Sequence, residues 1–107
     1  MLKPEDILRP TPAGLYCPPG DFYIDPVRPV GRAVITHGHS DHARSGHDHV
    51  AATPETLDIM ACRYGDDFAG AAVGLAYGRP IERDGVEISL VPAGHVLGSA
   101  QAVIRWK

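Results

Sequence analysis

The segment Ala33-Val34-Ile35-Thr36-His37-Gly38-His39-Ser40-Asp41-His42 joins an apolar, β-branched run directly to three histidines and an aspartate. Residues 33–36 have the composition of a buried strand. Imidazole and carboxylate are the side chains that bind borderline divalent metals such as zinc. Sites in open α/β sheets form outside the carboxyl ends of the strands. The segment therefore predicts an α/β fold with a metal site at the end of a strand.

The spacing within the cluster allows two neighbouring metal positions. His37 and His39 are two residues apart, so they point the same way in an extended backbone. Asp41 and His42 are adjacent and diverge unless the chain turns there into a helix. One metal would take His37 and His39, and the other would take Asp41 and His42. The alternative is a polar surface loop that happens to be rich in histidine.

A third imidazole follows the second strong strand signal of the chain. Residues 86–90 alternate apolar and polar side chains, and the strand ends at a loop that carries His95 between Gly94 and Gly98. His95 could supply the nitrogen that the His37 and His39 pair lacks. A lone histidine in such a loop is more often structural, so the ligand interpretation depends on the upstream cluster.

Several other residues have two readings. Asp25, at the end of an expected strand, could accept a proton from a ligand histidine and fix its tautomer, although an aspartate before a proline is also typical of a turn. His47 and His49 are interpreted as solvated or helix-end histidines. Arg44 is close enough to the cluster to contact a bound phosphate. Cys62 is expected to lie in a helix with its side chain packed against other residues.

Composition sets the broad class. A chain of 107 residues forms one domain at most, and 44% hydrophobic with 21% charged residues is typical of a globular protein. The net charge of −3 gives no global attraction for nucleic acid but leaves room for a local basic groove. Cys17 and Cys62 form no CxxC pair, which favours a reducing compartment. No apolar run reaches the length of a membrane span and no signal peptide is present, so a cytoplasmic location is expected.

Turn and capping signals predict the remaining elements. Residues 14–17 and 22–24 are expected to form a hairpin across Pro18-Pro19-Gly20. A helix is expected to begin after Thr53 as its cap and to end at Gly65. Strands are expected at 49–53, 86–90 and 100–106, with a turn at 83–85. Residues 68–77 are rich in alanine and glycine and give no clear pattern.

The 36–42 segment resembles the HxHxDH signature of the metallo-β-lactamase superfamily. Asp25 resembles the first motif of that superfamily and His95 the third. The run Gly94-His95-Val96-Leu97-Gly98-Ser99-Ala100 is similar to the nuclease branch that carries the β-CASP insertion. Residues 9–17 and 20–26 resemble the bacterial ligase-associated DNA exonucleases within that branch.

The resemblance implies an αββα sandwich with two zinc ions, of which this chain would be the N-terminal half. His37, His39 and His95 would hold one ion, Asp41 and His42 the other, and Asp25 would hydrogen-bond to a ligand without touching metal. A hydroxide held between the metals would attack phosphorus, with Asp41 and His42 as catalytic residues. Manganese could replace zinc.

The resemblance also implies partners and an incomplete site. The substrate would be nucleic acid, DNA more than RNA, and a DNA ligase or helicase could be a protein partner. Because the later ligands and the second half of the sandwich do not occur within the 107 residues, we expect weak or no activity from this chain alone. The alternatives are a small-molecule hydrolase of the thiolester or lactam type and a non-enzymatic module that binds a partner.

Overall fold

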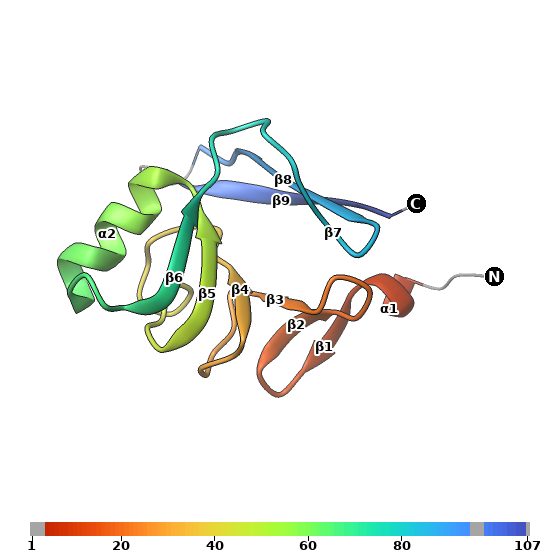
Figure 1. The fold of residues 1–107 in the computed structure, drawn as a ribbon, viewed down its shortest axis with the longest axis horizontal. Helices are drawn as coiled ribbons and strands as arrows, with labels where there is room; N and C mark the ends of the chain where they lie inside the picture. The colour runs from red at the N-terminus through yellow and green to blue at the C-terminus, as the bar shows by residue number, and fades with distance from the viewer. Residues whose placement is uncertain (1–3, 95–97, 107) are drawn as a thin grey trace.

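The computed structural model describes residues 4–94 and 98–106, and Figure 1 shows their arrangement. In chain order the elements are α1 (Pro4–Ile7), β1 (Arg9–Thr11), β2 (Gly14–Cys17), β3 (Phe22–Ile24), β4 (Arg32–Val34), β5 (His47–Ala52), α2 (Pro54–Tyr64), β6 (Ala69–Gly74), β7 (Ile81–Arg83), β8 (Val86–Pro92) and β9 (Ala100–Trp106). Strands dominate, and α2 is the only helix of more than one turn among the described residues.

The strands form two sheets. The first has six strands in the order β1-β2-β3-β4-β5-β6, and the second has three in the order β7-β8-β9. In the first sheet β1, β2 and β3 pair antiparallel, whereas β3, β4, β5 and β6 pair parallel. The second sheet is antiparallel throughout. The hairpin expected at 14–24 is therefore present as β2 and β3.

Two apolar clusters hold the layers together because neighbouring residues of β4 and β5 point to opposite faces. Ala33 and Val50 pack with Met60 of α2 on one face of the six-stranded sheet. Val34 packs with residues such as Ile88 and Leu90 of β8 on the other face. The helix and the small sheet therefore cover opposite faces of the large sheet, as Figure 1 shows.

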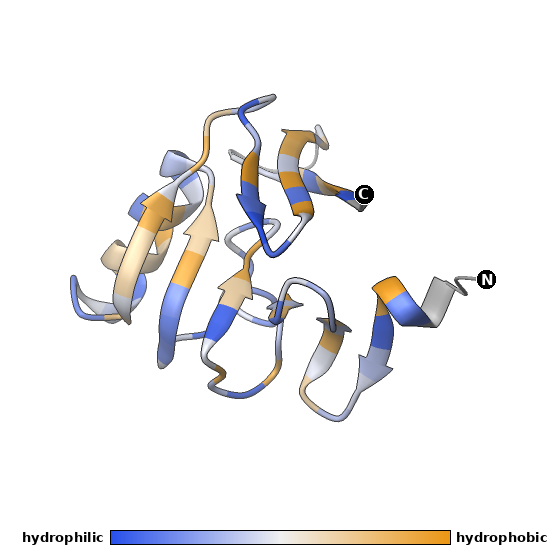
Figure 2. Ribbon diagram, turned by 45° about the vertical axis from the view of Figure 1, so that its right-hand side comes forward, coloured by the Kyte–Doolittle hydropathy of each residue, from blue (hydrophilic) through white to orange (hydrophobic). Residues whose placement is uncertain are grey.

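The expected αββα sandwich is wrong. The described residues supply one helix layer and two sheets, with no helix on the outer face of the β7–β9 sheet. The sequence explains this, because β8 buries Val86, Ile88 and Leu90 but turns polar side chains such as Glu87 and Ser89 outward. A helix needs an apolar surface to pack against, and this outer face offers little of it. In Figure 2, polar and apolar colours alternate along a strand of the small sheet.

Helix α2 begins and ends where its capping residues predict. The Thr53 side chain accepts a hydrogen bond from the Thr56 N–H, Pro54 occupies the first turn, and the Gly65 N–H donates to the Ala61 carbonyl. Both Thr53 and Thr56 hydroxyls also donate to the Gly98 carbonyl, at 2.7 and 3.1 Å. These two bonds tie the segment that leads into β9 to the start of α2. No helix in the described part of the chain has the length and hydrophobicity needed to span a membrane.

Two expectations about individual residues are wrong, and one stretch that gave no clear pattern is a strand. His47 is 1% exposed and lies in β5, so it is not a solvated histidine. Cys62 is exposed on α2 and is not packed inside it. Residues 69–74, which showed no clear pattern, form the edge strand β6.

Candidate metal centre

The candidate metal centre lies at the carboxyl ends of the parallel strands β3 and β4. Asp25 follows β3, and the segment from Thr36 to His42 follows β4. The backbone of Asp25 has a φ of 46°, a left-handed conformation that aspartate tolerates better than most residues. Its N–H still donates to the Val34 carbonyl at 2.9 Å. The turn after β3 therefore brings its carboxylate beside the end of β4.

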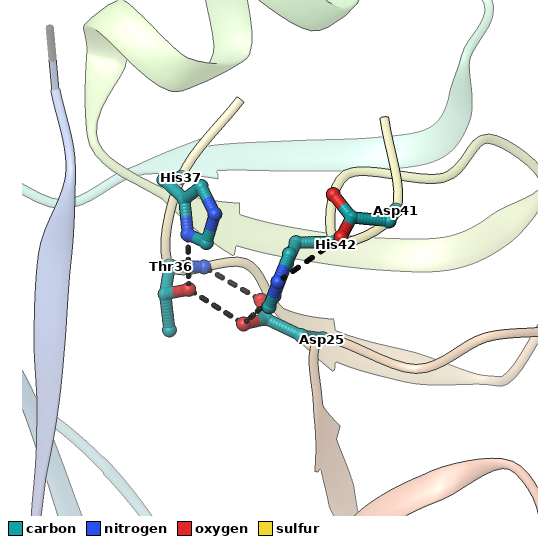
Figure 3. Close-up of polar contacts among 5 residues, drawn as sticks. All are labelled: Asp25, Thr36, His37, Asp41 and His42. Carbon is teal, nitrogen blue, oxygen red and sulfur yellow. Dashed lines mark hydrogen bonds and ion pairs between the residues drawn. The ribbon is translucent and has the colours of Figure 1, made fainter. Parts of the chain in front are cut away.

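The Asp25 carboxylate organises the cluster, as Figure 3 shows. Its Oδ1 accepts the Thr36 N–H at 2.8 Å, and its Oδ2 accepts the Thr36 hydroxyl. The same Oδ2 lies 2.9 Å from Nδ1 of His42. The Asp25 side chain is only 14% exposed, so water screens these contacts weakly.

These contacts define the tautomers of two histidines. The Thr36 hydroxyl has one proton and donates it to Asp25. Its oxygen therefore accepts a hydrogen bond from Nδ1–H of His37, 2.9 Å away. A carboxylate can only accept, so His42 donates from Nδ1 to Asp25. We infer that Nε2 is the basic nitrogen of both rings. This is the arrangement by which carboxylates and hydroxyls orient metal-binding histidines.

Three of these residues could hold a metal ion. Asp25, His37 and His42 each offer a ligand atom, and the three atoms lie within 4.8 Å of one another. The His37 and His42 rings are 4.1 Å apart between centroids. Because both Asp25 oxygens already accept hydrogen bonds, the supporting role suits Asp25 better than direct ligation.

Asp41 supplies a second carboxylate next to His42. Its Oδ2 lies 3.6 Å from Nε2 of His42, and its side chain is 73% exposed. Two donors about 2.0–2.2 Å from a tetrahedral ion are roughly 3.4 Å apart, so this pair has the spacing of two ligands on one metal. Imidazole and carboxylate donors fit zinc or manganese. The donor set therefore fits the metals that the sequence predicts.

The other predicted ligands are placed differently. The rings of His37 and His39 meet edge to face at 5.0 Å between centroids, and His39 is outside the group whose ligand atoms approach within 4.8 Å. His95 lies outside the described residues, so its convergence on the cluster stays a prediction. The structure thus brings His42 to His37, although the sequence assigned these residues to separate metals.

Contacts from α2 fix the segment, and the sequence analysis missed them. Arg63 donates to the Gly38 carbonyl at 2.6 Å. A Cβ atom on Gly38 would lie 2.8 Å from Cγ2 of Ile59, so only glycine fits this close approach. Thr36 was also missed, although its place between a strand and the first histidine is the signal that could have revealed it.

His47 has a structural role outside the cluster. Its Nδ1 accepts the Val30 N–H at 3.1 Å, and burial lowers the pKa of its imidazole. The ring is therefore neutral, and it links β5 to the loop between β3 and β4. This bond satisfies Nδ1 at a buried strand position, whereas the buried Nε2 has no hydrogen-bond partner among the described residues.

Two cavities lie near this part of the sheet. The first, about 340 Å³, opens between the two sheets beside β6, is mostly apolar, and includes none of the cluster histidines in its lining. The second, about 500 Å³, is lined by Asp41 together with Ser40 and Arg44. The second cavity adjoins the candidate metal centre through Asp41.

Comparison with known proteins finds a distant relative. No family model matches the chain. A stretch of 92 residues, 86% of the chain, is 30% identical to a protein of Opitutus terrae named "Probable DNA ligase". The match covers 9% of that protein's length, so the chain corresponds to a small part of it.

Proposed function

We propose that this chain carries the metal centre of a metal-dependent phosphodiester hydrolase, a DNA exonuclease of a repair or ligation system. The observation that carries the proposal is the orientation of His37 and His42, whose basic nitrogens are set by Thr36 and Asp25. Such support from a carboxylate and a hydroxyl is typical of metal ligands and is not needed by solvated surface histidines.

The donor atoms give each residue a role. His37, His42 and Asp41 would hold a zinc or manganese ion, with His39 and His95 as further proposed ligands and Asp25 as their hydrogen-bonded support. A bound divalent cation would supply a Lewis acid for phosphoryl oxygens and an activated water. Arg63 and Gly38 keep the segment in place against α2.

Two observations favour nucleic acid as the substrate. Residues 94–100 resemble the run found in the nuclease branch, whereas the signature at 36–42 is shared with small-molecule hydrolases. The relative from Opitutus terrae bears the name of a DNA ligase, an enzyme that acts on DNA. We therefore propose DNA in preference to RNA, and a ligase or helicase as a protein partner.

A substrate panel tests the proposal against a small-molecule hydrolase. Labelled single-stranded DNA, RNA, a thiolester and a β-lactam would be incubated with the zinc-loaded or manganese-loaded chain and with a His37→Ala/His42→Ala variant. We expect slow cleavage of DNA, or tighter DNA binding when metal is present, and we expect both to disappear in the variant. Turnover of the thiolester or lactam without any effect on DNA would contradict the proposal.

Metal content distinguishes a hydrolase from a non-enzymatic module that binds a partner. A chain that holds no zinc or manganese but forms a stable complex with a DNA ligase or helicase would be a non-enzymatic module. In that case the histidine cluster would be structural, and DNA binding would not change when metal is added.

A further inference from the structure

The 500 Å³ cavity beside Asp41 carries two arginines that the fold does not use. The polar residues that line it are Arg28, Ser40, Asp41, Arg44 and Ser45. They come from two segments, the loop between β3 and β4 and the turn that ends the histidine cluster. A volume of this size is typical of sites that bind small molecules or parts of larger ones.

Neither arginine is neutralised by the protein. Within residues 4–94 and 98–106, no hydrogen bond or ion pair joins the Arg28 or Arg44 side chain to another residue. Other arginines differ, since Arg32 pairs with Asp21 at 3.2 Å. The Nε of Arg44 is buried and has no acceptor, which is uncommon in folded proteins.

The charge of the cavity favours an anion. Two guanidinium groups face one carboxylate, so the lining has a net charge of about +1, although the whole chain carries −3. Guanidinium groups bind phosphate oxygens through paired N–H donors, and the Ser40 and Ser45 hydroxyls add further donors. The lining therefore has the chemistry of a phosphate site.

Asp41 connects the cavity to the candidate metal centre. It lines the cavity and also lies 3.6 Å from Nε2 of His42. A phosphate held by Arg28 and Arg44 would thus lie next to the proposed metal ligands.

We propose that Arg28 and Arg44 bind a backbone phosphate of a single-stranded DNA substrate, adjacent to the phosphodiester that faces the histidine cluster. This inference rests on the proposed function, because it assumes a nucleic acid strand at the metal centre. The inference identifies the residues that would position the DNA strand. It also identifies the cavity that would hold the phosphate, which the histidine signature does not predict.

Salt-dependent binding of a labelled, single-stranded DNA oligonucleotide to the metal-free chain tests this inference. Fluorescence anisotropy between about 50 and 200 mM salt gives the slope of log K against log salt. Each phosphate contact with a single strand contributes about −0.7 to this slope. Because both arginines contact one phosphate, the Arg28→Ala/Arg44→Ala variant should bind more weakly, with a slope shallower by about 0.7.

A matched variant controls for net charge. Arg79→Ala/Arg105→Ala removes two exposed arginines that do not line the cavity and should leave the slope close to that of the native chain. Because Arg44 is partly buried, circular dichroism must show that its variant is folded. Arg28→Glu, at an exposed position, is a second variant that should weaken binding more than Arg79→Glu.

The binding results test only whether the cavity arginines bind a DNA phosphate. Equal slopes for the two double variants, or no measurable binding by the native chain, would overturn the inference. Competition by inorganic phosphate as strong as by the oligonucleotide would indicate a site for free phosphate and not for a strand. Since no metal is present, failure of the proposed metal centre would leave this result unchanged.

Discussion

Replacing Asp25 with asparagine should weaken zinc binding while the fold persists. The new side chain would keep an oxygen for the Thr36 N–H, but its amide nitrogen cannot accept the Thr36 hydroxyl or the Nδ1 proton of His42. His42 would then favour the other tautomer, with its proton on Nε2, where the metal is expected. Loss of such a support costs roughly 10–100-fold in metal affinity.

The magnitude follows from two lost hydrogen bonds. Each bond to a charged group contributes about 1.5–3 kcal/mol, so the two lost bonds alone would cost about 3–6 kcal/mol. The asparagine amide can donate to Nδ1 of His42 in its other tautomer and to the Thr36 oxygen, so we expect a net fall of about 2 kcal/mol in the free energy of unfolding. The left-handed φ of 46° is compatible with asparagine, so the backbone should not change.

Titration with zinc against a chromophoric chelator measures the effect. Asp21→Asn is the matched control, because Asp21 also has a positive φ of 53° and binds Tyr16 and Arg32 outside the cluster. Asp21→Asn should leave zinc affinity within about twofold of the native value. Native zinc affinity in Asp25→Asn would refute the reasoning that the carboxylate orients His42.

Three further predictions concern Thr36 and Gly38 in the cluster and His47 outside it. Thr36→Val should lower zinc affinity roughly tenfold and stability by about 1–3 kcal/mol, measured by chelator competition and urea unfolding; unchanged values would show that its hydroxyl is dispensable. Gly38→Ala should destabilise the chain by about 1–3 kcal/mol, because its Cβ would overlap Ile59, and an unchanged melting temperature would contradict this. His47 has a lowered pKa, so the unfolded state binds its proton first as pH falls below about 6.5. The free energy of unfolding of the native chain should therefore fall from about pH 7 to about pH 5 more steeply than that of His47→Asn. The difference in slope should be at most about 1.4 kcal/mol per pH unit. The control variant His49→Asn, at an exposed position, should follow the native curve.

The sequence predicted the elements that have local signals. The Thr53 cap, the Gly65 end of the helix and the Pro18-Pro19-Gly20 turn each depend on a few neighbouring residues, and all appear in the structure. Strand β8 was found from its alternation of buried and partly exposed residues. Such signals act within one element and survive whatever the element packs against.

Features that depend on distant parts of the chain were not predicted. β6 is an edge strand of alanine and glycine with almost no buried side chain, so its sequence has no periodic pattern. Burial of His47 depends on the Val30 N–H, which is 17 residues away in the chain. The αββα expectation came from resemblance and not from periodicity, and the polar outer face of β8 opposes it.

The sequence predicted which residues form the candidate site better than it predicted which of them lie together. The sequence predicted that Asp25 and the histidines of residues 37–42 follow strands, and the structure places them after β3 and β4. It paired His37 with His39, whereas the turn after His39, closed by hydrogen bonds from the His42 and Ala43 N–H groups to the His39 carbonyl, brings His42 back toward His37. Spacing alone could not show this turn.

Zinc stoichiometry tests the central claim most directly. The native chain and the His37→Ala/His42→Ala variant would be dialysed to equilibrium against zinc, and bound metal would be measured by elemental analysis. We expect at least one zinc ion per native chain and a clear loss in the folded variant. Equal zinc content in the two proteins, or none in the native chain, would contradict a metal centre at this cluster.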